Sequence, residues 1–175
     1  MIGFISQSNY IPWRGFIDLI RQSDIYIIYD SMQFTKNDWR NRNLIRLNEK
    51  EHWLSVPCGS SISRSIDEVR PTNANWYIKH AQTLKHSYAK APYWKEFGEE
   101  LLTVYQGLAG KTLSEINERL LRYILKVEGV TTKVIRDVSL MDKEYIFQLD
   151  KSERLAEICK LIGVSTYLSA PAGKN

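Results

Sequence analysis

The first polar residues of the chain have side chains that suit the binding of an anion. The run Gln7-Ser8-Asn9-Tyr10 places amides, a hydroxyl and a phenol directly before an expected helix. The amino end of a helix carries free N–H groups and a partial positive charge, so it favours a phosphate. A turn with an N-cap is the alternative, but Gln7 and Tyr10 exceed what capping requires. We predict that Gln7, Asn9 and Tyr10 bind substrate or phosphate.

Asp30 and the basic segment after it supply a second group of candidates. Asp30 closes an apolar run, where a carboxylate can act as a general base, although Asp is also common in turns. Arginine can clamp a phosphate or carboxylate through two parallel hydrogen bonds. The segment therefore suggests Lys36, Arg42 and Asn43 as ligand-binding residues. A solvated basic loop is the alternative interpretation.

Lys79 and His80 form a third candidate pair. They follow Trp76 at helical spacing, so the three side chains share adjacent surface. Histidine is the natural general acid–base near neutral pH, whereas a lone histidine on a helix is more often structural or exposed. We predict His80 and Asp30 as catalytic groups and Lys79 as a binding residue. The histidines have no metal-like grouping, so no metal site is expected.

Familiar cofactor and nucleophile motifs are absent from the sequence. It contains no GxGxxG, no Walker loop, no HExxH and no GxSxG. No motif requires a cofactor. An alternative function that uses ATP and Mg²⁺ is still compatible with the sequence. Cys58 and Cys159 fit two free thiols in a reducing compartment.

The composition is compatible with several kinds of binding partner and does not distinguish among them. The net charge of +4 fits a polyanion, a phosphate-bearing metabolite or no specific partner. Five Trp and ten Tyr suit stacking on sugars or bases, or simply an aromatic-rich core. No apolar run approaches the roughly 20 residues that span a bilayer, and the start lacks the basic region of a signal peptide. We expect a cytoplasmic protein without a membrane span, whose oligomeric state the sequence leaves open.

The order of apolar segments predicts a mostly parallel sheet between layers of helices. Strands are expected at residues 2–7, 24–29, 132–138 and 165–169, and helices at residues 13–22 and 151–162. Strand, helix, strand within about 30 residues is a βαβ unit with parallel pairing. Ligands bind such sheets beyond the carboxyl ends of the strands. That rule selects residues 7–15, 30–43 and 169–175, and it adds Lys174 to the candidate binding residues.

A hairpin and a helical segment are expected between the two βαβ-like halves. The hairpin would pair residues 43–47 with 52–56 through a loop at Asn48 to Glu51, and residues 75–106 are helical with a break near Ala91-Pro92. A further helix over 112–128 begins with a capping box of Thr112 and Glu115. The predicted fold is a Rossmann-like, three-layer α/β domain over residues 1–175, with the hairpin and helical segment as an insertion.

Several of these segments together resemble the WbqC-like family, and the likeness covers essentially the whole chain. The motifs in order are Gln7-x-x-Tyr10-x-Pro12-Trp13-x-Gly15, Tyr29-Asp30 with Gln33-Phe34, Asn41-Arg42-Asn43, Trp53-Leu54-x-Val56-Pro57, Trp76-x-x-Lys79-His80, Tyr88-x-Lys90-Ala91-Pro92-Tyr93, Leu113-x-x-Ile116-Asn117 and Tyr167-Leu168-Ser169. The resemblance adds Gln33 to the candidate binding residues. Family members typically continue for several tens of residues beyond the last motif, so the resemblance leads us to expect that the domain over residues 1–175 is without the C-terminal tail usual in the family.

The resemblance implies a setting in bacterial O-antigen gene clusters and a glycyl or aminoacyl transfer onto an amino sugar. A transferase acting on a nucleotide-linked amino sugar is therefore the first functional hypothesis. The second is a nucleotidyl- or adenylate-forming enzyme, from a weaker likeness to the nucleotidylyltransferase and pantoate-ligase superfamily. The His-x-Gly-His of that superfamily has no counterpart between Tyr10 and Phe16. The third is a nucleic-acid-binding module that uses the basic, aromatic stretch from Lys36 to Arg46.

Overall fold

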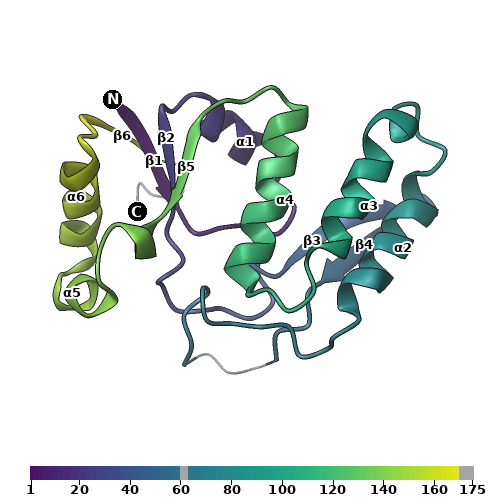
Figure 1. Ribbon diagram of the computed structural model, residues 1–175, viewed down its shortest axis with the longest axis horizontal. Coiled ribbons are helices and arrows are strands. Elements are labelled where there is room, and N and C mark those ends of the chain that lie inside the picture. The colour runs from purple at the N-terminus through teal and green to yellow at the C-terminus, as the bar shows by residue number, and fades with distance from the viewer. Residues whose placement is uncertain (60–62, 170–175) are drawn as a thin grey trace.

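The computed structural model describes residues 1–59 and 63–169, and a parallel sheet forms its centre (Figure 1). The sheet has the order β5-β2-β1-β6, and every neighbouring pair is parallel. Its strands are β1 (Ile2–Ser6), β2 (Ile25–Ile28), β5 (Lys133–Arg136) and β6 (Thr166–Leu168). All residues of β2 are buried, as expected for a parallel strand covered on both faces.

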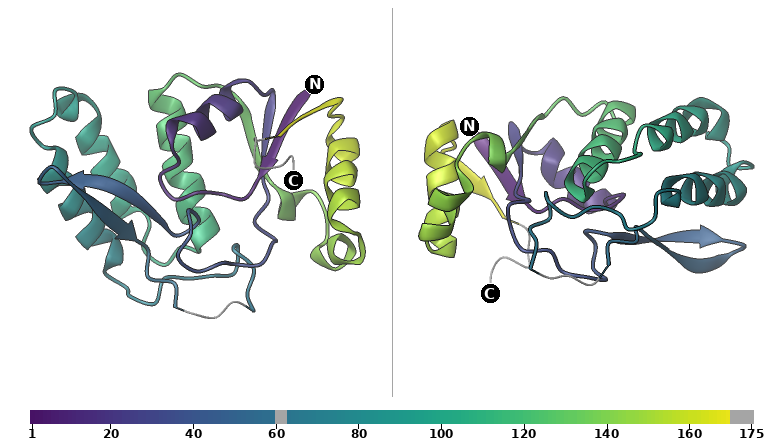
Figure 2. Two further views of the ribbon diagram at one scale, coloured as in Figure 1. Left: turned by 180° about the vertical axis from the view of Figure 1, so that it is seen from behind. Right: turned by 60° about the horizontal axis from the view of Figure 1, so that its bottom comes forward.

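Helices cover both faces of this sheet, which gives three layers (Figures 1 and 2). On one face, Phe4 and Tyr26 pack with side chains of α1 (Arg14–Arg21) and α4 (Leu113–Val127). On the other, Ile5 and Ile27 pack with side chains of α5 (Lys143–Gln148) and α6 (Lys151–Ile162). Neighbouring strand residues face opposite sides because side chains alternate along a strand. The predicted Rossmann-like α/β class is confirmed.

The hairpin and two helices form a second unit beside the sheet, which we call the hairpin lobe (residues 42–106). Strands β3 (Arg42–Leu47) and β4 (Lys50–Ser55) pair with each other in a separate two-stranded sheet, and α2 (Trp76–Tyr88) and α3 (Glu99–Gln106) lie beside them (Figure 1). Asn48 and Glu49 both have positive φ and make a two-residue turn. The expected four-residue loop is therefore wrong, because β4 begins at Lys50, two residues earlier than predicted, whereas β3 ends at Leu47 as expected.

Three further boundaries differ from the prediction. The helical stretch contains a π-helix, η1 (Trp94–Gly98), directly before α3. Residues 137 and 138, expected in a strand, belong to the 3₁₀ turn η2 (Asp137–Ser139). Helix α5 was not predicted, because its six residues are too few to display a helical period.

Helix α4 joins the two units, because it buries side chains on two sides. Leu121 and Leu125 pack on the sheet, whereas Ile116 and Leu120 pack on the core of the hairpin lobe. Its predicted capping box is present at Thr112. Among the helices of the described part of the chain, none is long and apolar enough to cross a membrane.

Candidate functional site

Two loop segments meet at the carboxyl edge of the parallel sheet. Residues 7–11 follow β1, and residues 38–43 comprise the end of the loop before β3 and the first two residues of β3; we call them the paired segments. The backbone N–H of Tyr10 donates to the carbonyl of Trp39 over 2.8 Å. The side-chain amide of Asn43 donates to the carbonyls of Tyr10 and Ile11 over 3.2 and 2.5 Å. The motif residues around Gln7 and Asn43 are therefore neighbours in space.

A network of buried polar side chains holds the paired segments in place. The backbone N–H and hydroxyl of Ser8 donate to the two carboxylate oxygens of Asp30 over 2.8 and 2.7 Å. The amide of Asn117 donates to the hydroxyl of Ser8 and to the carbonyl of Arg40, both over 2.9 Å. Burial raises the pKa of Asp30, whereas the two hydrogen bonds from Ser8 lower it and leave a net rise. Asp30 thus fixes the position of Ser8 at the end of β1.

Asp137 makes the corresponding contact at the end of β5. The backbone N–H and hydroxyl of Ser31 donate to one of its oxygens over 3.1 and 2.5 Å. Burial raises the pKa of Asp137, although hydrogen bonds from Ser31 oppose the rise. The carboxyl edge therefore holds two buried carboxyl groups whose ordinary acidity is weakened.

The accessible side of the paired segments carries an arginine stacked on tryptophan. The guanidinium carbon of Arg42 lies 4.1 Å from the ring centroid of Trp53, and the ring of Trp39 lies 5.8 Å from that of Trp53. Trp39 and Trp53 are 49% and 43% exposed. Arg42 faces Ser55 across the hairpin and Trp53 faces Leu44, so Arg42 and Trp53 are diagonal neighbours on one face.

The charge of Arg42 is not balanced by a neighbour. Within residues 1–59 and 63–169, no carboxylate forms an ion pair with Arg42, and its buried Nε has no hydrogen-bond partner. Arg40, two residues earlier, contacts Gln7 and Asp38 but also has a buried Nε without a partner there. Two guanidinium groups beside exposed aromatic rings can bind an anion attached to a planar or sugar ring.

Tyr10 and His80 belong to a different environment, the core of the hairpin lobe. The phenol oxygen of Tyr10 lies 2.7 Å from Nδ1 of His80 and 2.6 Å from the phenol oxygen of Tyr105. His80 also bonds to the backbone of Ser55, and Trp76 meets its ring edge-on at 5.0 Å. Burial lowers the pKa of His80 to about 4, so its imidazole is neutral at pH 7.

This buried histidine predicts an acid-sensitive fold. The pKa of His80 is about 4 in the folded protein and 6.5 in the unfolded chain, so the folded state favours the neutral imidazole. The free energy of unfolding is therefore highest above pH 6.5, and it decreases as the pH falls toward the folded pKa. That loss amounts to about 3 kcal/mol. Urea unfolding across this window should show a shallower pH dependence for His80→Gln, which keeps a donor and an acceptor. Equal pH profiles would contradict a neutral, buried His80.

The other predicted residues are dispersed. Asn9 is half-buried within the paired segments, and Gln33 is exposed and bridges to Ser65. Lys36 and Lys79 are exposed, away from the contacts described above. Lys174 lies outside the described residues. The structure therefore brings Gln7, Asp30, Arg42 and Asn43 to one edge, with Tyr10 and His80 behind it.

Asn117 and Asp137 were not selected from the sequence as site residues. A usable signal exists for Asn117, because a polar amide adjoins the apolar positions of an otherwise regular helix face. Over the described residues, no group of three His, Cys, Asp or Glu side chains is placed to hold a metal ion. Cys58 and Cys159 are free, and burial raises the pKa of Cys58 to about 12, so it lacks the reactivity of a nucleophile.

Comparison with known proteins agrees with this arrangement of motifs. The model of the WbqC-like protein family matches residues 7–175. The chain belongs to the WbqC-like protein family. This WbqC-like protein is also 36% identical over 175 residues to the uncharacterized protein Rv1507c of Mycobacterium tuberculosis, a match that covers 98% of the chain and 73% of the relative. No solved structure matches it.

Proposed function

We propose that this WbqC-like protein is a transferase that acts on a nucleotide-linked amino sugar, by glycyl or aminoacyl transfer, in surface polysaccharide synthesis. The observation that carries the proposal is the unbalanced charge of Arg42, stacked on Trp53 at the carboxyl edge of the sheet. Ligands bind at this edge in open α/β sheets.

The two guanidinium groups would hold the diphosphate of such a ligand. Arg42 is half-buried, so its charge attracts phosphate more strongly than a fully solvated cation would. Arg40 contacts Gln7 and forms an ion pair with Asp38 over 3.3 Å, so it would add hydrogen-bond donors, whereas Arg42 would supply the unbalanced charge. The exposed rings of Trp39 and Trp53 would stack on the base or the sugar.

In the transfer, the neutral amine of the sugar would attack the carbonyl carbon of an activated acyl donor, so that the C–N bond forms as the bond to the donor's activating group breaks and that group leaves. The amine gives up a proton in this step, so the site needs a proton acceptor. Asp30 has a raised pKa and reaches the paired segments through the hydroxyl of Ser8. We assign it the role of accepting the proton by way of Ser8. His80 has its ring nitrogens engaged by Tyr10 and Ser55, so its part in the proposal is to position Tyr10.

A binding screen tests the proposal. The purified protein is titrated with UDP- and dTDP-linked amino sugars, with UDP, and with a short oligothymidine, each at low and high salt. A ligand that binds only the native state raises the melting temperature by mass action. A shift with nucleotide sugars that persists at high salt supports the transferase.

A shift only with the oligothymidine, lost at high salt, would refute it in favour of nucleic-acid binding, because phosphate-backbone binding depends steeply on salt. No shift with any nucleotide sugar would also refute it. Where a nucleotide sugar binds, mass spectrometry after incubation with glycine and ATP then looks for the acylated amino sugar.

A further inference from the structure

An apolar cavity lies between the hairpin lobe and α4, beside Ile11 of the paired segments. Its volume is about 440 Å³, within the range of about 300–1,000 Å³ that is typical of small-molecule sites. Its walls come from β3, the end of α2, η1, α3 and α4, represented by Leu44, Leu84, Phe97, Leu101, Leu120 and Ile124. We call it the interlobe cavity.

The lining of the interlobe cavity identifies the chemistry of its ligand. Among the described residues, no acidic or basic side chain lines it, and its polar side-chain groups are the phenols of tyrosines and the indole of Trp94. The Tyr123 hydroxyl is already bonded to the carbonyl of Phe97 over 2.6 Å, and that of Tyr88 to the backbone of Arg46 over 3.0 Å. A charged group inside would lose its hydration without a partner, so an uncharged hydrocarbon is favoured.

Three unusual backbone features lie at the walls of this cavity. Ile11 is β-branched and has a φ of 47°, a left-handed conformation that costs such a residue about 1–2 kcal/mol. Helix η1 is a π-helix, a rare geometry that is frequent at functional sites. A Cβ on Gly98 would lie 2.4 Å from ring atoms of Trp94, so only glycine allows that ring to lie against the π-helix.

The cavity adjoins the candidate site along the chain. Ile11 and Leu44 line it, and each directly follows a residue of the paired segments, Tyr10 and Asn43. The amide of Asn43 holds the carbonyl of Ile11 in its left-handed position. The apolar cavity and the paired segments therefore share Ile11 as a common boundary.

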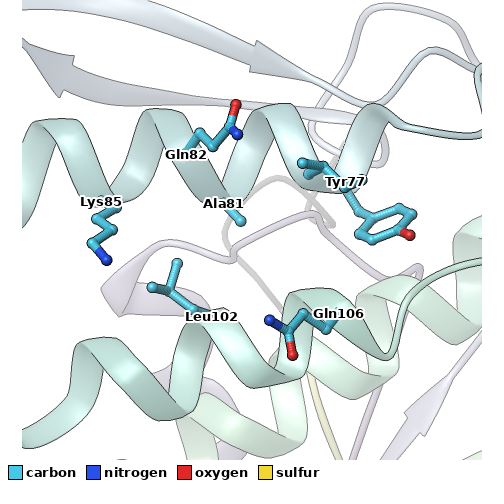
Figure 3. Close-up of a pocket in the computed structure, with 7 residues that line it drawn as sticks. Tyr77, Ala81, Gln82, Lys85, Leu102 and Gln106 are labelled. Carbon is cyan, nitrogen blue, oxygen red and sulfur yellow. The ribbon is translucent and has the colours of Figure 1, made fainter.

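A second hollow, between α2 and α3, offers a contrast. It has a similar volume of about 410 Å³, but its lining includes the charged side chain of Lys85 and the amides of Gln82 and Gln106 beside its apolar residues (Figure 3). Leu102 of α3 lines this hollow, whereas the preceding residue, Leu101, lines the interlobe cavity. Consecutive residues of one helix thus separate the two hollows.

We propose that the interlobe cavity binds the uncharged hydrocarbon part of a small molecule. The proposal is independent of the nucleotide sugar, because its residues are distinct from Arg40, Arg42 and Asp30. It adds to the protein an apolar binding site whose lining includes Ile11 of the paired segments.

Straight-chain alcohols from butanol to octanol are the first probes, measured by isothermal titration calorimetry on the full chain. Each added methylene should strengthen binding about fourfold until the cavity is filled. Indole is the second probe, because the aromatic walls also suit a ring. Whichever of the two binds more tightly then assigns the ligand as a chain or a ring.

Leu101→Trp places a bulky ring in the interlobe cavity, and Leu102→Trp is its matched control in the α2–α3 hollow. We expect Leu101→Trp to weaken hexanol binding at least about tenfold, because the added ring occupies the space. Leu102→Trp should bind as the natural protein does. Ala91→Trp, at the exposed rim, provides a second blocked variant if Leu101→Trp does not fold, as judged by circular dichroism.

Three results would overturn the proposal: affinity that does not rise with chain length, equal binding by the Leu101→Trp and Leu102→Trp variants, or loss of binding in Leu102→Trp alone. Absence of binding by any alcohol and by indole would overturn it as well. None of these results bears on nucleotide-sugar binding, so failure here is distinguishable from failure of the transferase proposal.

Discussion

Replacement of Arg42 by alanine should weaken the binding of a nucleotide-linked sugar by about 10- to 100-fold, because a charge-assisted hydrogen bond to phosphate contributes about 1.5–3 kcal/mol. The guanidinium has no carboxylate partner within the described residues, so none of its charge is neutralised before a ligand arrives. Folding stability should change little, since the side chain gives up only its stacking on Trp53, worth about 0.5–1 kcal/mol at an exposed site.

Two control variants test whether the loss of affinity is specific to the guanidinium of Arg42. Arg42→Lys keeps the charge but not the planar fork, so it should retain part of the affinity and lose the stacking on Trp53. Arg46→Ala removes an exposed arginine from the same strand and the same face, and should bind as the natural protein does. Equal affinity in Arg42→Ala and Arg46→Ala, measured by calorimetry with UDP-linked amino sugar, would contradict the assigned phosphate site.

The sheet could be predicted because its signals are local. Apolar runs of strand length alternate with amphipathic stretches, and the crossover rule then makes the pairing parallel. The hairpin turn could not be placed as well. Asn48 and Glu49 both adopt positive φ without a glycine to announce the turn, and Lys50 and Glu51 look like loop residues although they are paired in β4.

The site was less accessible to sequence reasoning, since its contacts join distant residues. Arg42 was selected for its chemistry, but its position over Trp53 depends on the exact register of the hairpin. Tyr10 was selected for its phenol, and the structure directs that group to His80 and Tyr105 in a core that forms only after the hairpin lobe folds. Local spacing does not determine which neighbours a buried side chain meets.

Asn117 illustrates the same limit in its strongest form. Its amide bonds to Ser8 and to Arg40, which lie 109 and 77 positions away in the sequence. One side chain thereby connects α4 to both paired segments. Because Asn117 is completely buried, a change of its charge or of its hydrogen-bond donors changes the free energy of the whole network.

Asn117→Asp is accordingly expected to lower the free energy of unfolding by about 3–5 kcal/mol near neutral pH. The new carboxylate would be buried and would lie close to Asp30, facing the carbonyl of Arg40 without a donor. The pKa of the new carboxyl group would be higher in the folded state than in the unfolded chain. The loss of folding free energy due to its charge is therefore absent below the unfolded pKa, and it increases as the pH rises through the folded pKa.

The control is Asn117→Leu, which removes the same donor without adding a charge. It should cost about 1–3 kcal/mol at every pH, because the carbonyl of Arg40 loses its partner. Urea unfolding near pH 8 and near pH 5 should therefore show the Asp variant approaching the Leu variant as the solution becomes more acidic. If the two variants differ by the same amount at both pH values, position 117 is not enclosed beside a carboxylate. The paired segments would then be held to α4 by some contact other than this amide.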